Sequence, residues 1–286
     1  MTATARSVEL RSIAQGIADA LPITVEEVAL TGSVSRGVAH DVSDIEILIV
    51  TRDALALEDC FSLAAASGLT DLGTWGRQGV PTKRVSGYRD GAPVELIWWS
   101  RAYAEMAVDA IFAGDLSACA DAIANGVALR TSGLLAQWQE RLRHYPDELA
   151  RAQIEAAALT WGGFAPAGLL TLVRPGERLA LVERMVDDAL RVVRIVFALN
   201  RVWKPSQKRL ADRAATLTRT PERLAERIEE ALTETDPHRA LLVLTELQAE
   251  TVALAPDGPN INRARTWLSD ALEILVHEHQ LGREHS

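Results

Sequence analysis

The chain has 286 residues, of which 48% are hydrophobic and 24% charged, the balance of a folded globular protein with one or two domains. It carries 30 Lys and Arg against 39 Asp and Glu, a net charge of -9, which argues against binding the phosphate backbone of nucleic acids. Two cysteines exclude a disulfide framework and are typical of a reducing cytoplasm, and no stretch reaches the roughly 18 apolar residues of a membrane span, so we expect a cytoplasmic protein without a membrane partner.

The first 115 residues contain all of the predicted strands except one short strand at 127–130. Near the N-terminus, Ile13, Ile17 and Leu21 recur at helical spacing among charged residues, which predicts an amphipathic helix. Runs rich in β-branched and aromatic residues then predict strands, with residues 89–91 as the turn of a hairpin. The predicted strands cover 28–30, 44–50, 83–88, 92–99 and 127–130, and the predicted helices among them cover 54–67 and 100–113.

From about residue 134 onward the pattern becomes helical. Ala, Leu, Arg and Glu recur at helical spacing, and turns that contain Gly and Pro separate the segments. We therefore predict an α+β fold, with a mixed sheet and its helices at residues 1–130 followed by an all-α helical bundle at residues 131–286. The predicted long helices cover 147–160, 177–203, 221–233, 237–253 and 261–279.

Two acids in the second predicted strand point to metal chemistry. Side chains alternate along a strand, so Asp44 and Glu46 lie on one face while Ile45 and Ile47 point to the core. Neighbouring carboxylates repel each other unless a positive group lies between them, and Mg²⁺ binds carboxylate oxygens while leaving positions for phosphate. The segment therefore predicts a Mg²⁺ site. The charge distribution agrees, because residues 1–115 hold 9 basic against 16 acidic residues.

A Gly-Ser pair before these acids predicts a phosphate contact. Gly32 lets the backbone approach a phosphate closely, and the residues after it can begin a helix whose N–H groups face an anion. We expect Ser33 to cap that helix and to donate its hydroxyl to a phosphate, with Arg36 one turn further on as a second contact. Lys83 and Arg84 are interpreted as a solvated strand end and not as phosphate contacts.

A third carboxylate belongs to an apolar strand. Glu95 is the only charged residue between Gly91 and Arg101. An acid buried without a partner is destabilising, so Glu95 calls for a metal ion or a hydrogen-bond donor. A central strand that places Glu95 beside Asp44 and Glu46 would complete a metal site with three carboxylates.

This combination of residues resembles the nucleotidyltransferase superfamily that includes DNA polymerase β. Within that superfamily it is most similar to the aminoglycoside nucleotidyltransferases of the kanamycin 4′-O type. The resemblance rests on Gly32-Ser33, on residues 43–46 with Glu as the second acid, and on Val94-Glu95 followed by aromatic residues. It covers roughly residues 28–105, and a looser likeness continues at residues 200–203 in the helical half.

The resemblance implies a polymerase-β-like core and a Mg²⁺-dependent enzyme. Such an enzyme would move a nucleoside monophosphate, AMP from ATP in the simplest case, to a hydroxyl group of a small molecule. The three acids would hold the metal, and Glu95 would serve as general base if it is not fully committed to the metal. Kanamycin-type relatives use a separate glutamate as the base, and Glu155 is the nearest candidate here. The residues implied to hold the phosphates are Gly32, Ser33, Arg36, Ser43 and Lys208.

The acceptor is the part of the function with the most alternatives. In the family, acids around the cleft recognise ammonium groups, so the resemblance favours a cationic amino sugar, with Glu183 and Asp187 as further candidate contacts. Neutral acceptors such as nucleosides or simple sugars are the alternative. The sequence also leaves open a homodimer, a catalytically silent, antitoxin-like regulatory protein on the same fold, and a transferase that modifies a protein.

Overall fold

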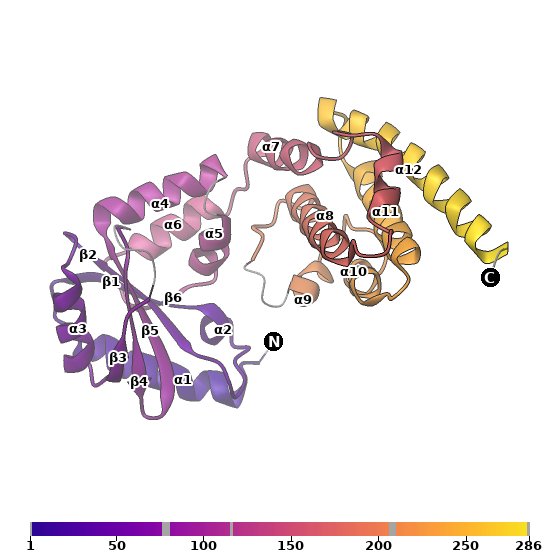
Figure 1. The fold of residues 1–286 in the computed structure, drawn as a ribbon. Helices are drawn as coiled ribbons and strands as arrows, with labels where there is room; N and C mark the ends of the chain where they lie inside the picture. Colours follow the sequence, from indigo (N-terminus) through magenta and orange to yellow (C-terminus); the bar gives the residue numbers. More distant parts are fainter. Residues whose placement is uncertain (1, 76–80, 115–116, 206–209, 285–286) are drawn as a thin grey trace. The chain divides into compact units, whose positions relative to one another are not determined.

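The computed structural model describes residues 2–75, 81–114, 117–205 and 210–284 (Figure 1). The chain divides into two compact units, Met1–His144 and Tyr145–Ser286. The boundary between the units lies after α6 (Leu134–Leu142), whereas the sequence predicted a boundary before this helix. Helix α6 falls in the first unit because it packs on β1 (Val25–Thr31) and α5 (Ser117–Ala124). In the described part of the chain, no helix is long and apolar enough to cross a membrane.

The first unit is built on a mixed β-sheet. Among the described residues the sheet has six strands in the order β3-β4-β5-β2-β1-β6, and only β2 and β5 run parallel to each other. The other strands are β2 (Ile45–Thr51), β3 (Thr70–Gly73), β4 (Lys83–Arg89), β5 (Ala92–Ser100) and β6 (Val127–Arg130). The five predicted strands are confirmed. β3 was not predicted, because two of its four residues are Asp71 and Gly73, types that are uncommon in strands.

Helices cover both faces of this sheet (Figure 1). On one face α1 (Ala5–Ala20) and α3 (Leu57–Ala66) bury the apolar side of the strands, where Leu10, Ile17, Ile47 and Leu96 are fully buried. On the other face α4 (Arg101–Ala113) packs on β5 and β2, and α6 packs on β1. Since side chains alternate along each strand, the face opposite the α1 side carries Glu46 and its neighbours.

The second unit is helical throughout its described residues. The five predicted long helices are confirmed, and Trp161 and Phe197 are the largest fully buried side chains of their core. A buried polar contact ties α8 (Arg178–Leu199) to the turn at residue 161, because Asp188 accepts hydrogen bonds from Trp161 Nε1 at 2.8 Å and from Arg184 Nε of its own helix at 2.6 Å. The helices are α7 (Asp147–Ala158), the 3-10 helix η1 (Pro166–Thr171), α8 (Arg178–Leu199), α9 (Leu210–Ala214), α10 (Leu224–Thr233), α11 (Pro237–Leu254) and α12 (Pro259–Glu284). The predicted class, a mixed sheet with helices followed by a helical region, is therefore confirmed.

Candidate active site

The glycine turn lies directly against one of the predicted acids. β1 ends at Thr31, and the short helix α2 (Gly32–Ser35) follows it. Gly32 has a φ of 71°, and a Cβ atom on it would stand 2.9 Å from Cδ of Glu46 and closer still to Oε2. Only glycine therefore allows the backbone to pass this close to the Glu46 carboxylate.

The residues after the turn differ in part from the prediction. Thr31, not Ser33, is the N-cap position of α2, so Ser33 is the second residue of the helix and does not cap it. The helix ends at Ser35, and Arg36 lies at its C-terminal end instead of inside a longer helix. The Arg36 guanidinium donates to Oδ2 of the buried Asp121 in α5 at 3.0 Å, so its contact with a phosphate stays a prediction.

Helix α1 anchors the chain between the glycine turn and the acids. Arg11 donates from Nε to the Val34 carbonyl at 3.1 Å and from Nη2 to the Ser35 carbonyl at 2.6 Å. Thr4 Oγ1 donates to the Ala39 carbonyl at 2.8 Å. These contacts tie the end of α2 and the segment after it to the N-terminal part of the chain. The backbone around Gly32 is therefore held in place from a helix that is distant in sequence.

A tight turn leads from this segment into β2. The Ser43 N–H donates to the His40 carbonyl at 2.9 Å, and the His40 N–H donates to Ser43 Oγ at 3.0 Å. Ser43 is buried, and its hydroxyl oxygen serves this turn while its own O–H can still donate. The turn delivers Asp44 to the start of β2, and the phosphate contact of Ser43 stays a prediction.

The sheet register brings two of the three acids side by side. Glu46 on β2 is the direct partner of Glu95 on the parallel strand β5, and of Thr31 on β1. Ser86 on β4 lies opposite Glu95 in turn. Directly opposed residues share one face of a sheet, so these four side chains form a row across four adjacent strands, spaced about 4.8 Å apart. Asp44 precedes β2 immediately and is half-buried like Glu46, as the strand alternation predicted.

Arg84 is the charged residue of this site that sequence reasoning assigned elsewhere. Its Nη1 donates to Oε1 of Glu95 at 2.9 Å, and the two side chains are 34% and 12% exposed. The guanidinium also lies over the ring of Trp75, 4.3 Å from its centroid. Arg84 is therefore an ion-pair partner and not a solvated strand end. The sequence did contain a signal for this contact, because Glu95 needs a donor and the neighbouring strand carries a basic residue.

Aromatic and thiol groups surround this ion pair. The ring of Trp99, which shares the Glu95 face of β5, meets Tyr103 edge-on with centroids 5.4 Å apart. Burial raises the pKa of Tyr103 and that of Cys119, and the positive charge of Arg84 opposes the rise in both. Across the described residues, no group of three His, Cys, Asp or Glu side chains is arranged to hold a metal ion. Glu46 and Glu95 therefore share a face of the sheet, but the three acids do not form an assembled ligand set.

The remaining predicted residues belong to the second half of the chain. Oε2 of Glu155, on α7, accepts from the Asn260 N–H at 2.8 Å in the first turn of α12. A negative charge at this position stabilises the start of a helix. Glu183 and Asp187 are exposed on α8, and Asp187 accepts from Arg191 Nε at 2.7 Å. Lys208 lies outside the described residues.

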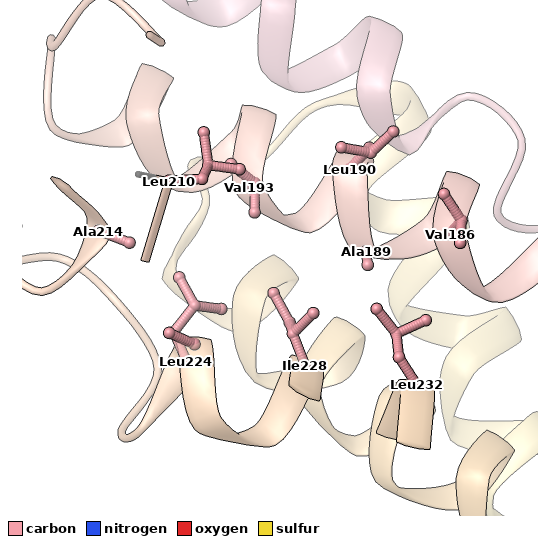
Figure 2. A pocket seen from close by; sticks show the side chains of 10 residues that line it. Val186, Ala189, Leu190, Val193, Leu210, Ala214, Leu224, Ile228 and Leu232 are labelled. Carbon is pink, nitrogen blue, oxygen red and sulfur yellow. The ribbon is translucent and has the colours of Figure 1, made fainter. Parts of the chain in front are cut away.

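The helical unit contains an apolar pocket, in contrast to the charged side chains around Glu95. Its volume is about 230 Å³, and aliphatic side chains from α8, α9 and α10 line it (Figure 2). Figure 2 shows Val186, Leu190 and Val193 on one side, with Ile228 and Leu232 across from them. Because the lining offers neither charge nor hydrogen-bonding side chains, this pocket is unsuited to a triphosphate. The predicted phosphate contacts among the described residues, from Gly32 to Ser43, lie in the first unit instead.

Comparison with known proteins adds three findings. A family model described as "Domain of unknown function (DUF4037)" matches residues 116–210, which spans the end of the first unit and the start of the second. No curated protein matches the chain. The crystal structure of a nucleotidyltransferase-like protein from Exiguobacterium sibiricum 255-15 is similar to this chain with a TM-score of 0.43 and 12% sequence identity, over 96% of this chain and 92% of that chain.

Proposed function

We propose that this protein is a Mg²⁺-dependent nucleotidyltransferase. It transfers a nucleoside monophosphate, AMP from ATP as the first choice, to a hydroxyl group of a small molecule and releases pyrophosphate. The observation that carries the proposal is the fit of Gly32 against the Glu46 carboxylate, on a strand in register with Glu95. A turn held this close to a pair of acids suits a site where backbone, phosphate and metal ligands meet.

The donor chemistry of the site fits a hard divalent cation. Asp44 and Glu46 would hold it with carboxylate oxygens, and Glu95 would be the third ligand once it leaves Arg84. When bound, Mg²⁺ neutralises charge on the triphosphate and lowers the pKa of the attacking hydroxyl. Neighbouring carboxylates in register repel each other, which gives these residues a reason to accept a cation.

The chain's own part in the reaction is mainly positioning. The acceptor oxygen forms a bond to the α-phosphorus while the bond from that phosphorus to pyrophosphate breaks, and the hydroxyl proton passes to a general base. Gly32 leaves room for the Glu46 carboxylate, and Ser33 and Ser43 would each offer an O–H donor to the phosphates. Glu155 as the base stays a prediction, since its carboxylate also holds the start of α12.

The acceptor class follows from charge. The first 115 residues hold 16 acidic against 9 basic residues, more than three metal ligands need, and Glu183 and Asp187 add exposed acids on α8. An excess of acids in the first unit attracts cationic molecules. We therefore place an amine-bearing hydroxyl compound, such as an amino sugar, first among the acceptors.

A catalytically silent protein on the same fold is the second candidate. The pairing of Glu95 with Arg84 favours it, because an acid that keeps a permanent counter-ion does not need a metal. The two candidates differ in whether the protein binds a metal–nucleotide complex and turns it over.

The test compares wild-type protein with Asp44→Asn and with Asp53→Asn, a matched control at an exposed acid beyond the other end of β2. Each protein is incubated with Mg²⁺, ATP and a panel of cationic and neutral hydroxyl compounds. Pyrophosphate release and adduct mass are measured. We expect adducts from wild type and the control, and a loss of about a hundredfold or more in Asp44→Asn. Adducts formed equally by Asp44→Asn contradict the site, and no adduct with any acceptor favours the silent protein.

A further inference from the structure

The position of Arg84 links two features of the candidate site. Glu46 and Glu95 lie side by side on one face of the sheet, and Asp44 directly precedes β2. Arg84 lies on β4 opposite Ile97 and reaches along the strand to Glu95. Its guanidinium therefore brings a positive charge to one of these acids.

The contacts of Arg84 favour an exchangeable partner over a fixed one. The guanidinium stacks on Trp75, which is 56% exposed, so the ion pair lies at the open side of the site. By contrast, Arg89 on the same strand donates to the Ser67 carbonyl at 2.7 Å and passes close to Gly16 and Gly68, which ties it to the packed chain. Its partner is a carboxylate, so phosphate oxygens can compete for the same guanidinium.

We propose that Arg84 holds Glu95 in the nucleotide-free protein and moves to the triphosphate when the metal–nucleotide complex binds. The proposal rests on the proposed function. In the exchange, Glu95 replaces a guanidinium by a cation, and Arg84 replaces a carboxylate by phosphate oxygens, for which its planar fork is well suited. Neither residue is left without a partner of opposite charge at either stage.

This exchange couples the binding of metal and nucleotide. A metal ion alone has to compete with Arg84 for Glu95, and the displaced guanidinium then has no new anionic partner from the ligand. A metal ion that arrives with a triphosphate provides a new partner for each residue. Arg84 is therefore a positioning residue that disfavours metal without nucleotide, and coupling of this kind is expected on the order of tenfold in affinity.

The test uses Arg84→Gln, which removes the charge, and Arg84→Lys, which keeps it without the fork. Arg52→Gln is the matched control, because Arg52 is 84% exposed and its carboxylate partner, Glu26, is 3.7 Å away and outside the site. Binding of Mn²⁺ alone is measured from the electron paramagnetic resonance signal of the free ion. Binding of α,β-methylene-ATP with and without Mn²⁺ is measured by calorimetry. The emission of Trp75 is taken as the difference between each protein and its Trp75→Phe counterpart, because the chain has seven tryptophans.

We expect Arg84→Gln to bind Mn²⁺ alone about tenfold more tightly than wild type, and to bind the Mn²⁺–nucleotide complex no more tightly. Arg84→Lys should lie between them, and Arg52→Gln should match wild type. Nucleotide should change the emission of Trp75, measured as this difference, in wild type but not in Arg84→Gln. Equal Mn²⁺ affinity in wild type and Arg84→Gln, in a wild-type protein that binds nucleotide, overturns the exchange alone. A wild-type protein that binds no nucleotide overturns the proposed function and the exchange together.

Discussion

Replacing Gly32 by alanine tests whether the glycine turn exists to accommodate the Glu46 carboxylate. Gly32 has a φ of 71°, and a Cβ on it would stand 2.9 Å from Cδ of Glu46. Gly91 provides a matched control, because its φ is 75° and a Cβ there would meet nothing within 4 Å. Both substitutions carry the same backbone strain, and only Gly32→Ala adds a collision with an acid of the site.

The expected loss of folding free energy is the sum of two contributions, backbone strain and the collision with Glu46. A left-handed backbone at alanine costs about 1 kcal/mol of folding free energy, which is the whole effect expected for Gly91→Ala. Forcing a side chain into filled space costs about 1–3 kcal/mol more, so Gly32→Ala is expected to lose about 2–4 kcal/mol. The Glu46 carboxylate also has to move by about 1 Å, and a shift of that size can lower a rate by about a hundredfold.

Urea denaturation measures the stability change, and pyrophosphate release with calorimetric binding of the Mn²⁺–nucleotide complex measures the effect on the site. Gly91→Ala should bind and react like wild type, with only the smaller loss of stability. The reasoning is refuted if Gly32→Ala and Gly91→Ala lose the same free energy of unfolding. Full nucleotide binding by a folded Gly32→Ala protein would refute the functional part.

Two further predictions concern groups buried in the first unit. Oε2 of the fully buried Glu27 accepts from the Ser132 N–H at 3.0 Å and the Leu134 N–H at 3.1 Å, so Glu27→Ala leaves two donors at the start of α6 without an acceptor. Urea denaturation should show a loss of about 2–4 kcal/mol, against less than about 1 kcal/mol for Glu26→Ala beside it, and similar losses would contradict this assignment. Burial, with a smaller contribution from Asp59, raises the pKa of Cys60 to about 11, so roughly one thiol in a thousand is ionised near pH 8. Alkylation followed by mass spectrometry should find Cys60 protected in the native protein and modified in urea, with the native rate rising about tenfold per pH unit; rapid native modification at pH 8 would be the contrary result.

Local sequence patterns were sufficient for most of the elements and for the half-buried positions of Asp44 and Glu46. Alternation in residues 44–50 places Asp44 and Glu46 opposite the isoleucines, and this depends only on the two-residue period of a strand. The long helices of the second half follow equally from helical spacing. Short elements such as β3 and α2 were missed or drawn too long, because four residues contain little periodicity and their hydrogen-bond partners lie elsewhere.

The partners of the site residues were decided only by the tertiary structure. The register that puts Glu46 beside Glu95, the reach of Arg84 to Glu95, and the anchoring of the glycine turn by Arg11 all join segments far apart in the chain. Sequence indicates that a half-buried acid needs a positive partner, since burial of a lone charge is unfavourable everywhere. Which of several cations or donors becomes that partner depends on strand order and register, and these emerge only when the whole sheet has formed.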